Sequence, residues 1–334
     1  MKPTEFRFQG PFASQTAAFA VHMERTGGHH VTLFLTLARL DRFLTLHHPT
    51  IAHLSRDVVR EWFASFSGLK RSAQDRYRSA TFQFCKYLRR DDPLTACPED
   101  FVPLRRDRSF RPHIYSVQEV ARLLDEARRQ PPSPSRLRPW TLELIVALLY
   151  SAGLRIGEVV RLDVGDYDRL EGTLLIRETK FEKTRLVPLA SSTRRLVDAY
   201  FERRGVLGFD MGPATPLIWP LAGSRPKRAC LGSVQQALTQ LMRQCGIKPP
   251  KGRGPRIHDM RHTFAAHRVL AWYRSGVDVQ SRLPHLATYM GHRGIESTQV
   301  YLTVIPGVLE EASSRLAHFA ASAFVERQDG HEQE

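Results

Sequence analysis

The chain has 334 residues, 42% of them hydrophobic and 25% charged, which is enough apolar material for two ordinary domains and rules out a disordered chain or a coiled coil. Its 49 Lys and Arg exceed its 34 Asp and Glu, and the net charge of +15 points to a polyanionic partner, nucleic acid ahead of a membrane surface. The four cysteines form no C-x-x-C pair, no apolar stretch is long enough to span a bilayer, and the start is not a signal peptide, so we expect a cytoplasmic protein rather than a disulfide-rich or zinc-ribbon domain.

Residues 1–107 predict a small helical domain. Apolar residues recur at helical spacing in four segments near 14–26, 31–47, 55–66 and 72–90. Ser55 and Ser72 are of the residue type that caps helix N-termini, and we expect each to cap the helix that follows it.

Basic side chains crowd the polar face of the last of these helices. A solvated helix face would account for them, and a DNA-contacting surface would account for them if the neighbouring domain binds DNA. The candidate DNA contacts are Lys70, Arg71, Arg76, Arg78 and Lys86.

A linker is predicted at 108–115, at the end of a stretch rich in proline and in charges of both signs. Ser116 and Glu119 then form a capping-box pattern that opens a second domain, for which we expect the bounds 116–325. The final residues, 326–334, form an acidic tail.

The second domain is predicted to be mainly helical with one small antiparallel sheet. A long apolar helix over 140–150 is broken at Gly153. The β-rich segments 172–180 and 184–189 predict a hairpin. Further helical patterns lie at 191–204, 231–245, 258–274, 282–291, 296–304 and 307–325.

Two segments in the first part of this domain carry cations suited to a phosphate group. Arg155 follows the helix break, and Glu158, one turn later, could hold that arginine or a neighbouring histidine. Lys180 lies in the hairpin, whose tip is slender enough to enter a DNA groove, and Lys183 is the competing lysine. Taken alone, Arg155 could be an ordinary surface arginine, and Lys180 could be a charge that protects a sheet edge.

The later part of the domain carries histidines, an arginine and a tyrosine. His258 and Arg261 are three residues apart on a predicted helix, so both can face a single group. His292 follows a glycine, and Tyr301 lies nine residues after it. A tyrosine on an amphipathic helix is more often a core residue than a nucleophile, so the order of the patterns matters more than any one of them.

In this order, the patterns resemble the tyrosine recombinase family, also called phage integrases. The matching segments read L-L-Y-S-A-G-L-R-I-G-E, T-K-F-E-K-T-R-L-V-P-L, H-D-M-R-H-T-F-A, Y-M-G-H and S-T-Q-V-Y, and they extend from about residue 113 to 305. The resemblance implies a two-domain tyrosine recombinase architecture, in which a helical core-binding (SAM-like) DNA-binding domain precedes an α+β catalytic domain.

The resemblance also implies a role for each residue. Tyr301 would attack a scissile DNA phosphate and leave a 3′-phosphotyrosyl link and a free 5′-hydroxyl. Lys180 would protonate the leaving oxygen, and His258 would take up the tyrosine proton. The residues implied for the phosphate oxygens are Arg155, Arg261 and His292, with Glu158 as an accessory carboxylate.

The chemistry asks for such a set independently. A phenol with a pKa of about 10 is a poor nucleophile at neutral pH and needs a base or electrostatic help. Negative charge on the non-bridging oxygens suits two bidentate arginines. Because a covalent intermediate stores the energy of the phosphodiester bond, we expect no metal, no ATP and no other cofactor.

The expected partners are double-stranded DNA, further copies of the chain in a dimer or tetramer, and accessory recombinases or DNA-bending proteins. The biological role would be integration, excision or transposition of a mobile element at the bacterial nucleoid. The apolar stripe of 307–325 fits packing within its own domain or on a neighbouring subunit equally well.

Three other functions compete with this interpretation. One is a catalytically silent DNA-binding regulator on the same fold, and another is a type IB topoisomerase. The third is a metallohydrolase using His258, His262 and His292, which lacks the H-E-x-x-H pattern and the clustered carboxylates that such a site needs.

Overall fold

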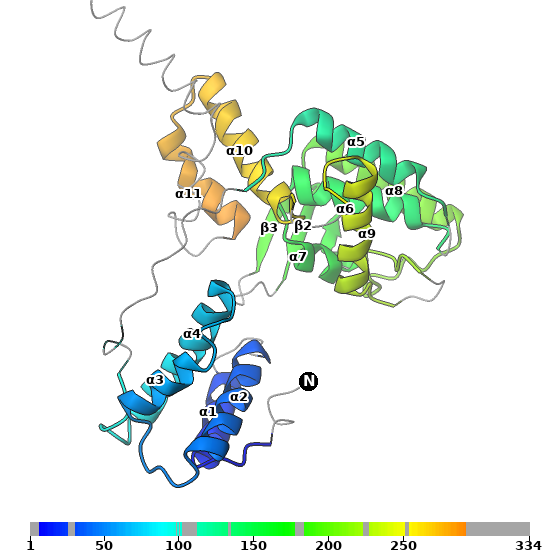
Figure 1. Cartoon of the computed structure of the whole chain (residues 1–334). Coiled ribbons are helices and arrows are strands. Elements are labelled where there is room, and N and C mark those ends of the chain that lie inside the picture. The colour runs from blue at the N-terminus through cyan, green and yellow to red at the C-terminus, as the bar shows by residue number, and fades with distance from the viewer. Residues whose placement is uncertain are drawn as a thin grey trace, which may run out of the picture. The chain divides into compact units, whose positions relative to one another are not determined.

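The computed structural model describes residues 7–25, 31–97, 99, 101, 112–132, 135–177, 184–222, 227–250 and 254–291. The chain divides into two compact units, the first carrying helices α1 to α4 and the second carrying helices α5 to α11 with a small sheet (Figure 1). Across these ranges, no helix combines the length and the apolar character that a bilayer crossing requires.

Helices α1 (Ala13–Arg25), α2 (Val31–His47), α3 (Arg56–Ala64) and α4 (Arg71–Leu88) form the first unit, drawn in blue to cyan in Figure 1. Its core is rich in aromatic rings. The Trp62 indole lies between other rings and donates a hydrogen bond to the Thr81 hydroxyl over 2.9 Å, so its one polar atom is satisfied within the core.

The two predicted N-caps of this unit have different outcomes. Ser55 caps α3, because its hydroxyl accepts a hydrogen bond from the Val58 amide. The prediction for Ser72 is wrong. The N-cap of α4 is Lys70, whose carbonyl accepts the first helical hydrogen bonds, so Ser72 already lies inside the first turn.

The second unit is built around an apolar helix. Helix α5 (Val117–Arg129) opens with the predicted capping box, in which the Ser116 hydroxyl accepts from the Glu119 amide and the Glu119 carboxylate accepts from the Ser116 amide. Helix α6 (Arg138–Ser151) is buried on almost every side and contacts α5, α8 and α10. A helix that is apolar all round belongs in a core, as α6 does.

The sheet is antiparallel with strand order β1 (Tyr167–Asp168), β2 (Thr173–Ile176) and β3 (Arg185–Pro188). Strands β2 and β3 are the two arms of the predicted hairpin, and in their register Ile176 pairs with Arg185. Strand β1 was not predicted, since two residues are too few to show alternation. Residues 178–183, which join β2 to β3, lie outside the described residues.

The remaining described elements are helical: α7 (Ile156–Arg161), a short 3-10 helix (Val164–Asp166), α8 (Ser191–Val206), α9 (Leu231–Gln244), α10 (Asp259–Arg274) and α11 (Val279–Met290). The prediction of a mainly helical chain with one small antiparallel sheet is therefore confirmed. The helices predicted at 296–304 and 307–325 and the acidic tail lie outside the described residues. Tyr115, the last residue of the predicted linker, is fully buried in the core of the second unit.

Candidate active site

Arg155 lies at the N-terminus of α7, directly after a sharp turn. Gly153 makes this turn with φ of 60°, in the left-handed region that favours glycine. A Cβ atom at this position would lie 2.4 Å from the Phe264 ring of α10, so the close approach of the turn to α10 also requires glycine. The turn holds Arg155 at the surface, where 27% of its side chain is exposed.

Glu158 lies buried beneath Arg155 and binds two arginines. Its carboxylate accepts from Nη1 of Arg155 over 2.7 Å and from the Arg155 amide over 2.9 Å. It also accepts from Nη2 and Nη1 of Arg185, over 3.0 and 3.3 Å. Burial by itself would raise the pKa of Glu158, but the hydrogen bonds and charge of Arg185, with those of Arg155, lower it to about 2.

The low pKa of Glu158 predicts an acid-dependent contribution to stability. Since the folded pKa is about 2 and the ordinary value is 4.5, the stabilisation is complete above pH 4.5 and is lost as the pH falls toward 2. We expect Glu158→Gln to reduce the free energy of unfolding at pH 7 by about 3 kcal/mol. Urea unfolding at pH 7 and pH 3 should show this difference shrinking at the lower pH.

The exposed Glu171, changed to Gln, serves as the control for this comparison and should leave the free energy of unfolding within about 0.5 kcal/mol of wild type. A Glu158→Gln deficit of equal size at both pH values would contradict the prediction.

Arg261 and Arg155 meet at the C-terminal end of α11. Arg261, in the first turn of α10, is only 2% exposed, and its Nη1 donates to the Gly153 carbonyl over 2.6 Å while its Nη2 donates to the Met290 carbonyl. Nη2 of Arg155 donates to the next carbonyl, that of Gly291, over 3.1 Å. Two arginines that are far apart in the sequence therefore hold adjacent carbonyls, immediately before the position of His292.

His258 is the N-cap residue of α10 and lies beside these arginines. Although the residue is exposed, protein atoms around its ring remove part of its hydration, and this desolvation, followed by the charges of Arg261, Arg256 and Arg155, lowers the pKa of His258. The His258 and His262 rings pack edge to face, with their centroids 5.0 Å apart. A histidine with a lowered pKa is neutral near pH 7 and can accept a proton.

The pKa of the second histidine, His262, is lowered to about 4, by burial first and then by His258. Over the part of the chain that the structure describes, no group of three or more His, Cys, Asp and Glu is placed to hold a metal ion.

The loop before His258 is fixed by a buried carboxylate. Asp259 accepts hydrogen bonds from both the side chain and the amide of Arg256, at 2.7 Å for Nη2 and 2.8 Å for the amide. The buried Tyr115 hydroxyl donates to the Arg256 carbonyl over 3.1 Å. These contacts hold the entry to α10, and with it His258, against the core of the unit.

The structure thus brings together Arg155, Glu158, His258 and Arg261 of the predicted set. Lys180, Lys183, His292 and Tyr301 lie outside the described residues. Among the basic residues of α4 and its N-cap, Lys70, Arg71, Arg76 and Lys86 are exposed. Arg78 is half-buried, with its guanidinium 4.4 Å from the centre of the Phe63 ring, so part of its role is packing.

Sequence reasoning missed Arg185. It binds the Glu158 carboxylate from the first position of β3, and its Nε donates to the Tyr289 carbonyl over 2.9 Å. A signal was present, because Arg185 alternates with Val187 and Leu189, which are buried, so the arginine falls on the inward face of the strand.

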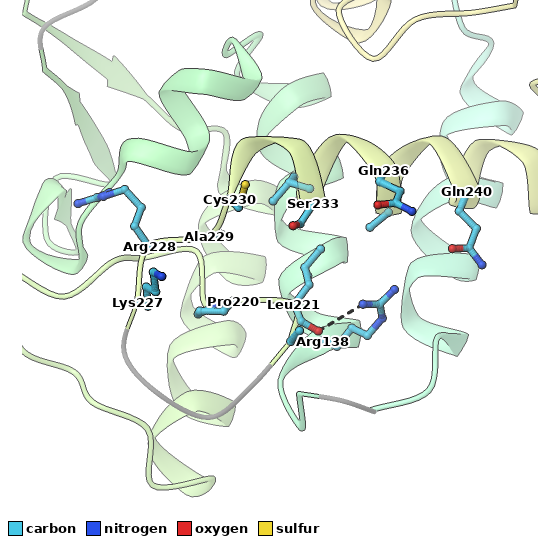
Figure 2. Close-up of a pocket in the computed structure, with 13 residues that line it drawn as sticks. Arg138, Pro220, Leu221, Lys227, Arg228, Ala229, Cys230, Ser233, Gln236 and Gln240 are labelled. Atoms are coloured by element: carbon cyan, nitrogen blue, oxygen red, sulfur yellow. Dashed lines mark hydrogen bonds between the residues drawn. The ribbon is translucent and has the colours of Figure 1, made fainter. Parts of the chain in front are cut away.

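A separate pocket of about 650 Å³ opens at the N-terminus of α9 (Figure 2). It is lined by Arg138, Lys227 and Arg228, and Arg138 donates to the Leu221 carbonyl over 3.3 Å. Arg228 binds Asp163 over 2.7 Å and so ties the segment before α9 to the end of α7. Of the predicted site residues that the structure describes, none lines this pocket.

Comparison with known proteins decides the family. Residues 115–306 match the model of the Phage integrase family, which covers more than half of the chain. The chain belongs to this family of tyrosine recombinases. It is a tyrosine-type site-specific recombinase that acts on DNA, and its matched region contains the whole cluster described above.

Relatives of similar length support the assignment. An integrase/recombinase named y4rB from Sinorhizobium fredii is 37% identical over 301 residues, which cover 89% of this chain and 88% of the relative. The tyrosine recombinase XerD of Rhizobium meliloti is 27% identical over 271 residues, which cover 79% of this chain and 80% of the relative. In fold, the chain is similar to a lambda integrase dimer bound to a core site, with a TM-score of 0.61 and 14% identity over 86% of this chain and 94% of that one.

Proposed function

We propose that the chain cleaves and rejoins DNA strands through Tyr301, by way of a 3′-phosphotyrosyl intermediate, and serves the integration, excision or transposition of a mobile element. The observation that supports this proposal is the convergence of Arg155 and Arg261 on adjacent carbonyls at the end of α11, beside His258. Residues from three separate motifs meet at one point, which lies at the start of the segment that leads to Tyr301.

The charge of this cluster suits a phosphate. Arg155 and Arg185 bind the buried Glu158 carboxylate, and Arg261 binds the end of α11 beside Arg155. The nearby carboxylate of Asp259 is paired with Arg256, so the four arginines and two carboxylates leave an excess of positive charge in a partly buried setting. When the scissile phosphate binds, its non-bridging oxygens replace carbonyl oxygens as acceptors for Arg155 and Arg261, with His292 assisting. Fixed donors in a site of low dielectric constant stabilise developing charge strongly.

Two proton transfers complete the reaction. His258, kept neutral by its surroundings, accepts the proton of the Tyr301 hydroxyl as its oxygen bonds to phosphorus. The bond from phosphorus to the 5′-oxygen breaks, and Lys180 protonates that oxygen. Lys183 is the alternative donor. Rejoining reverses these steps, so no energy source beyond the phosphotyrosyl bond is needed.

The wider context is also part of the proposal. The predicted core-binding domain, 1–107, contacts the duplex through Lys70, Arg71, Arg76, Arg78 and Lys86, and the catalytic domain is predicted at 116–325. Lambda integrase structures hold a dimer and a tetramer on DNA, and we expect dimers to tetramers here, with accessory recombinases or DNA-bending proteins, at the nucleoid in the cytoplasm.

The test is covalent capture of the protein on its DNA. A nicked duplex carrying the element's own terminal sequence, incubated with the full chain in EDTA and without nucleotide, should give an adduct that survives detergent on a denaturing gel. Proteolysis and mass spectrometry should place the DNA on the peptide that contains Tyr301. An adduct that requires metal, or one that maps elsewhere, would contradict the proposal.

A type IB topoisomerase would also form such an adduct, so the test needs a second substrate. Plasmids carrying two element ends should yield recombinants with exchanged flanks. Relaxation of any supercoiled plasmid without exchange would favour the topoisomerase.

A further inference from the structure

Arg185 lies where the sheet meets α11. It opens β3, and only 10% of its side chain is exposed. Its guanidinium passes close to Gly291, where an added Cβ atom would lie 3.0 Å from Nη1. Gly291 has φ of 66° and ends α11, so its missing side chain leaves room for the arginine.

The bonds of Arg185 run in two directions. Nη1 and Nη2 bind the two oxygens of Glu158, and Nε binds the Tyr289 carbonyl in the last turn of α11. A guanidinium is planar and presents its donors in a fixed fork, so these bonds set the angle between Glu158 and α11. Glu158 passes this constraint on, because its carboxylate also holds Nη1 and the amide of Arg155.

We propose that Arg185 is a positioning residue for strand cleavage, which fixes the Glu158 carboxylate, and through it Arg155, against the last turn of α11. The inference rests on the proposed function, in which Arg155 binds the scissile phosphate. Arg185 does not itself touch the phosphate.

The size of the effect follows from the geometry. Without Arg185, the buried Glu158 carboxylate loses two of its charged hydrogen bonds, and the pKa of Glu158 rises toward its ordinary value. Arg155 then rests on a carboxylate with no support from β3. A misplacement of about 1 Å in a catalytic group lowers rates by about 100-fold.

The experiment compares Arg185→Gln, Arg185→Lys, Glu158→Gln and the double Gln variant in the full chain. We expect Arg185→Gln to slow adduct formation on the nicked duplex by about 10- to 100-fold, with DNA affinity changed less than about threefold. The rate of adduct formation by Arg185→Lys should fall between the rates of Arg185→Gln and wild type. The double variant should be no slower than the slower single variant, because the two residues act as one unit.

Arg128→Gln is the matched control. Arg128 also binds a buried carboxylate, Glu143, over 2.6 Å in the same unit, but it lies on α5, and among the described residues no hydrogen bond or ion pair joins it to the site. If Arg185 were merely structural, Arg185→Gln would lose as much melting temperature as Arg128→Gln. Both variants would then form the adduct at a near-normal rate at a temperature where both are folded.

Hydrogen exchange gives a readout that does not depend on activity. The Arg155 amide donates to Glu158, so its exchange should accelerate in Arg185→Gln and not in Arg128→Gln. Unchanged exchange at Arg155, or rate losses that multiply in the double variant, would overturn the inference. If wild type forms no adduct, the proposed function fails, and the exchange result still decides whether Arg185 positions Arg155.

Discussion

Replacing Tyr301 by phenylalanine is expected to abolish the covalent adduct with DNA and to leave DNA affinity within about twofold of wild type. The substitution removes one hydroxyl and no charge, and affinity for DNA comes mainly from basic groups on phosphates. Without the phenol oxygen, no bond to phosphorus can form. A filter-binding titration and a denaturing gel on the same nicked duplex measure the two quantities.

Tyr167→Phe is the matched control for this prediction. Tyr167 lies on the sheet of the same unit, far along the chain from the predicted nucleophile, and its hydroxyl donates to Asp198 over 3.3 Å. Tyr167→Phe therefore loses an equivalent hydroxyl and should keep a normal adduct yield. An adduct that persists in Tyr301→Phe would show that another residue is the nucleophile. Binding without an adduct in wild type would identify a catalytically silent regulator.

The order of the motifs predicted four of the residues that the described structure brings together, Arg155, Glu158, His258 and Arg261, because each motif lies at a helix terminus and the fold brings these termini to one place. Gly153 marks the end of α6, and the left-handed Gly291 marks the end of α11. Helix ends carry unpaired carbonyls, and arginines bind such groups. Composition could not reveal these contacts, because a main-chain carbonyl has no signature in the sequence.

The partner of Glu158 could be predicted only in part. The spacing of three residues placed Arg155 within its reach, and the structure has that pair at 2.7 Å. Arg185 reaches the same carboxylate through the sheet, and this depends on the register that pairs Ile176 with Arg185. A slip of the register by one residue would turn Arg185 outward. Alternation in the strand was therefore a signal that Arg185 faces inward, but its contact with Glu158 depends on the register, which the sequence does not show.

Arg261→Lys is expected to slow adduct formation by about 1,000-fold, the size of effect seen when one fixed donor to a charged transition state is lost. Lysine keeps the charge but has no planar fork. It therefore cannot hold the Gly153 and Met290 carbonyls together, nor exchange them for two phosphate oxygens. Single-turnover rates on the nicked duplex, taken well below the melting temperature, measure the loss.

Because Arg261 is buried, its replacement also costs stability, and this cost has to be separated from the catalytic loss. Arg204 offers the comparison: it is fully buried in the same unit and donates to the Pro216 and Leu217 carbonyls over 2.9 and 3.1 Å. Arg204→Lys should lower the free energy of unfolding by a similar amount, about 1–3 kcal/mol, while keeping a near-normal rate. Equal rate losses in the two variants would mean that Arg261 is structural.

A substrate with sulfur in place of the 5′-bridging oxygen separates phosphate binding from protonation, since a thiolate leaves without a proton. It should restore cleavage by Lys180→Ala if Lys180 is the acid, and failure there would favour Lys183. The same substrate should not restore cleavage by Arg261→Lys, because the sulfur leaves the charge on the non-bridging oxygens unchanged. Rescue of Arg261→Lys would instead assign this buried arginine to the proton transfer and leave Arg155 to bind the phosphate alone.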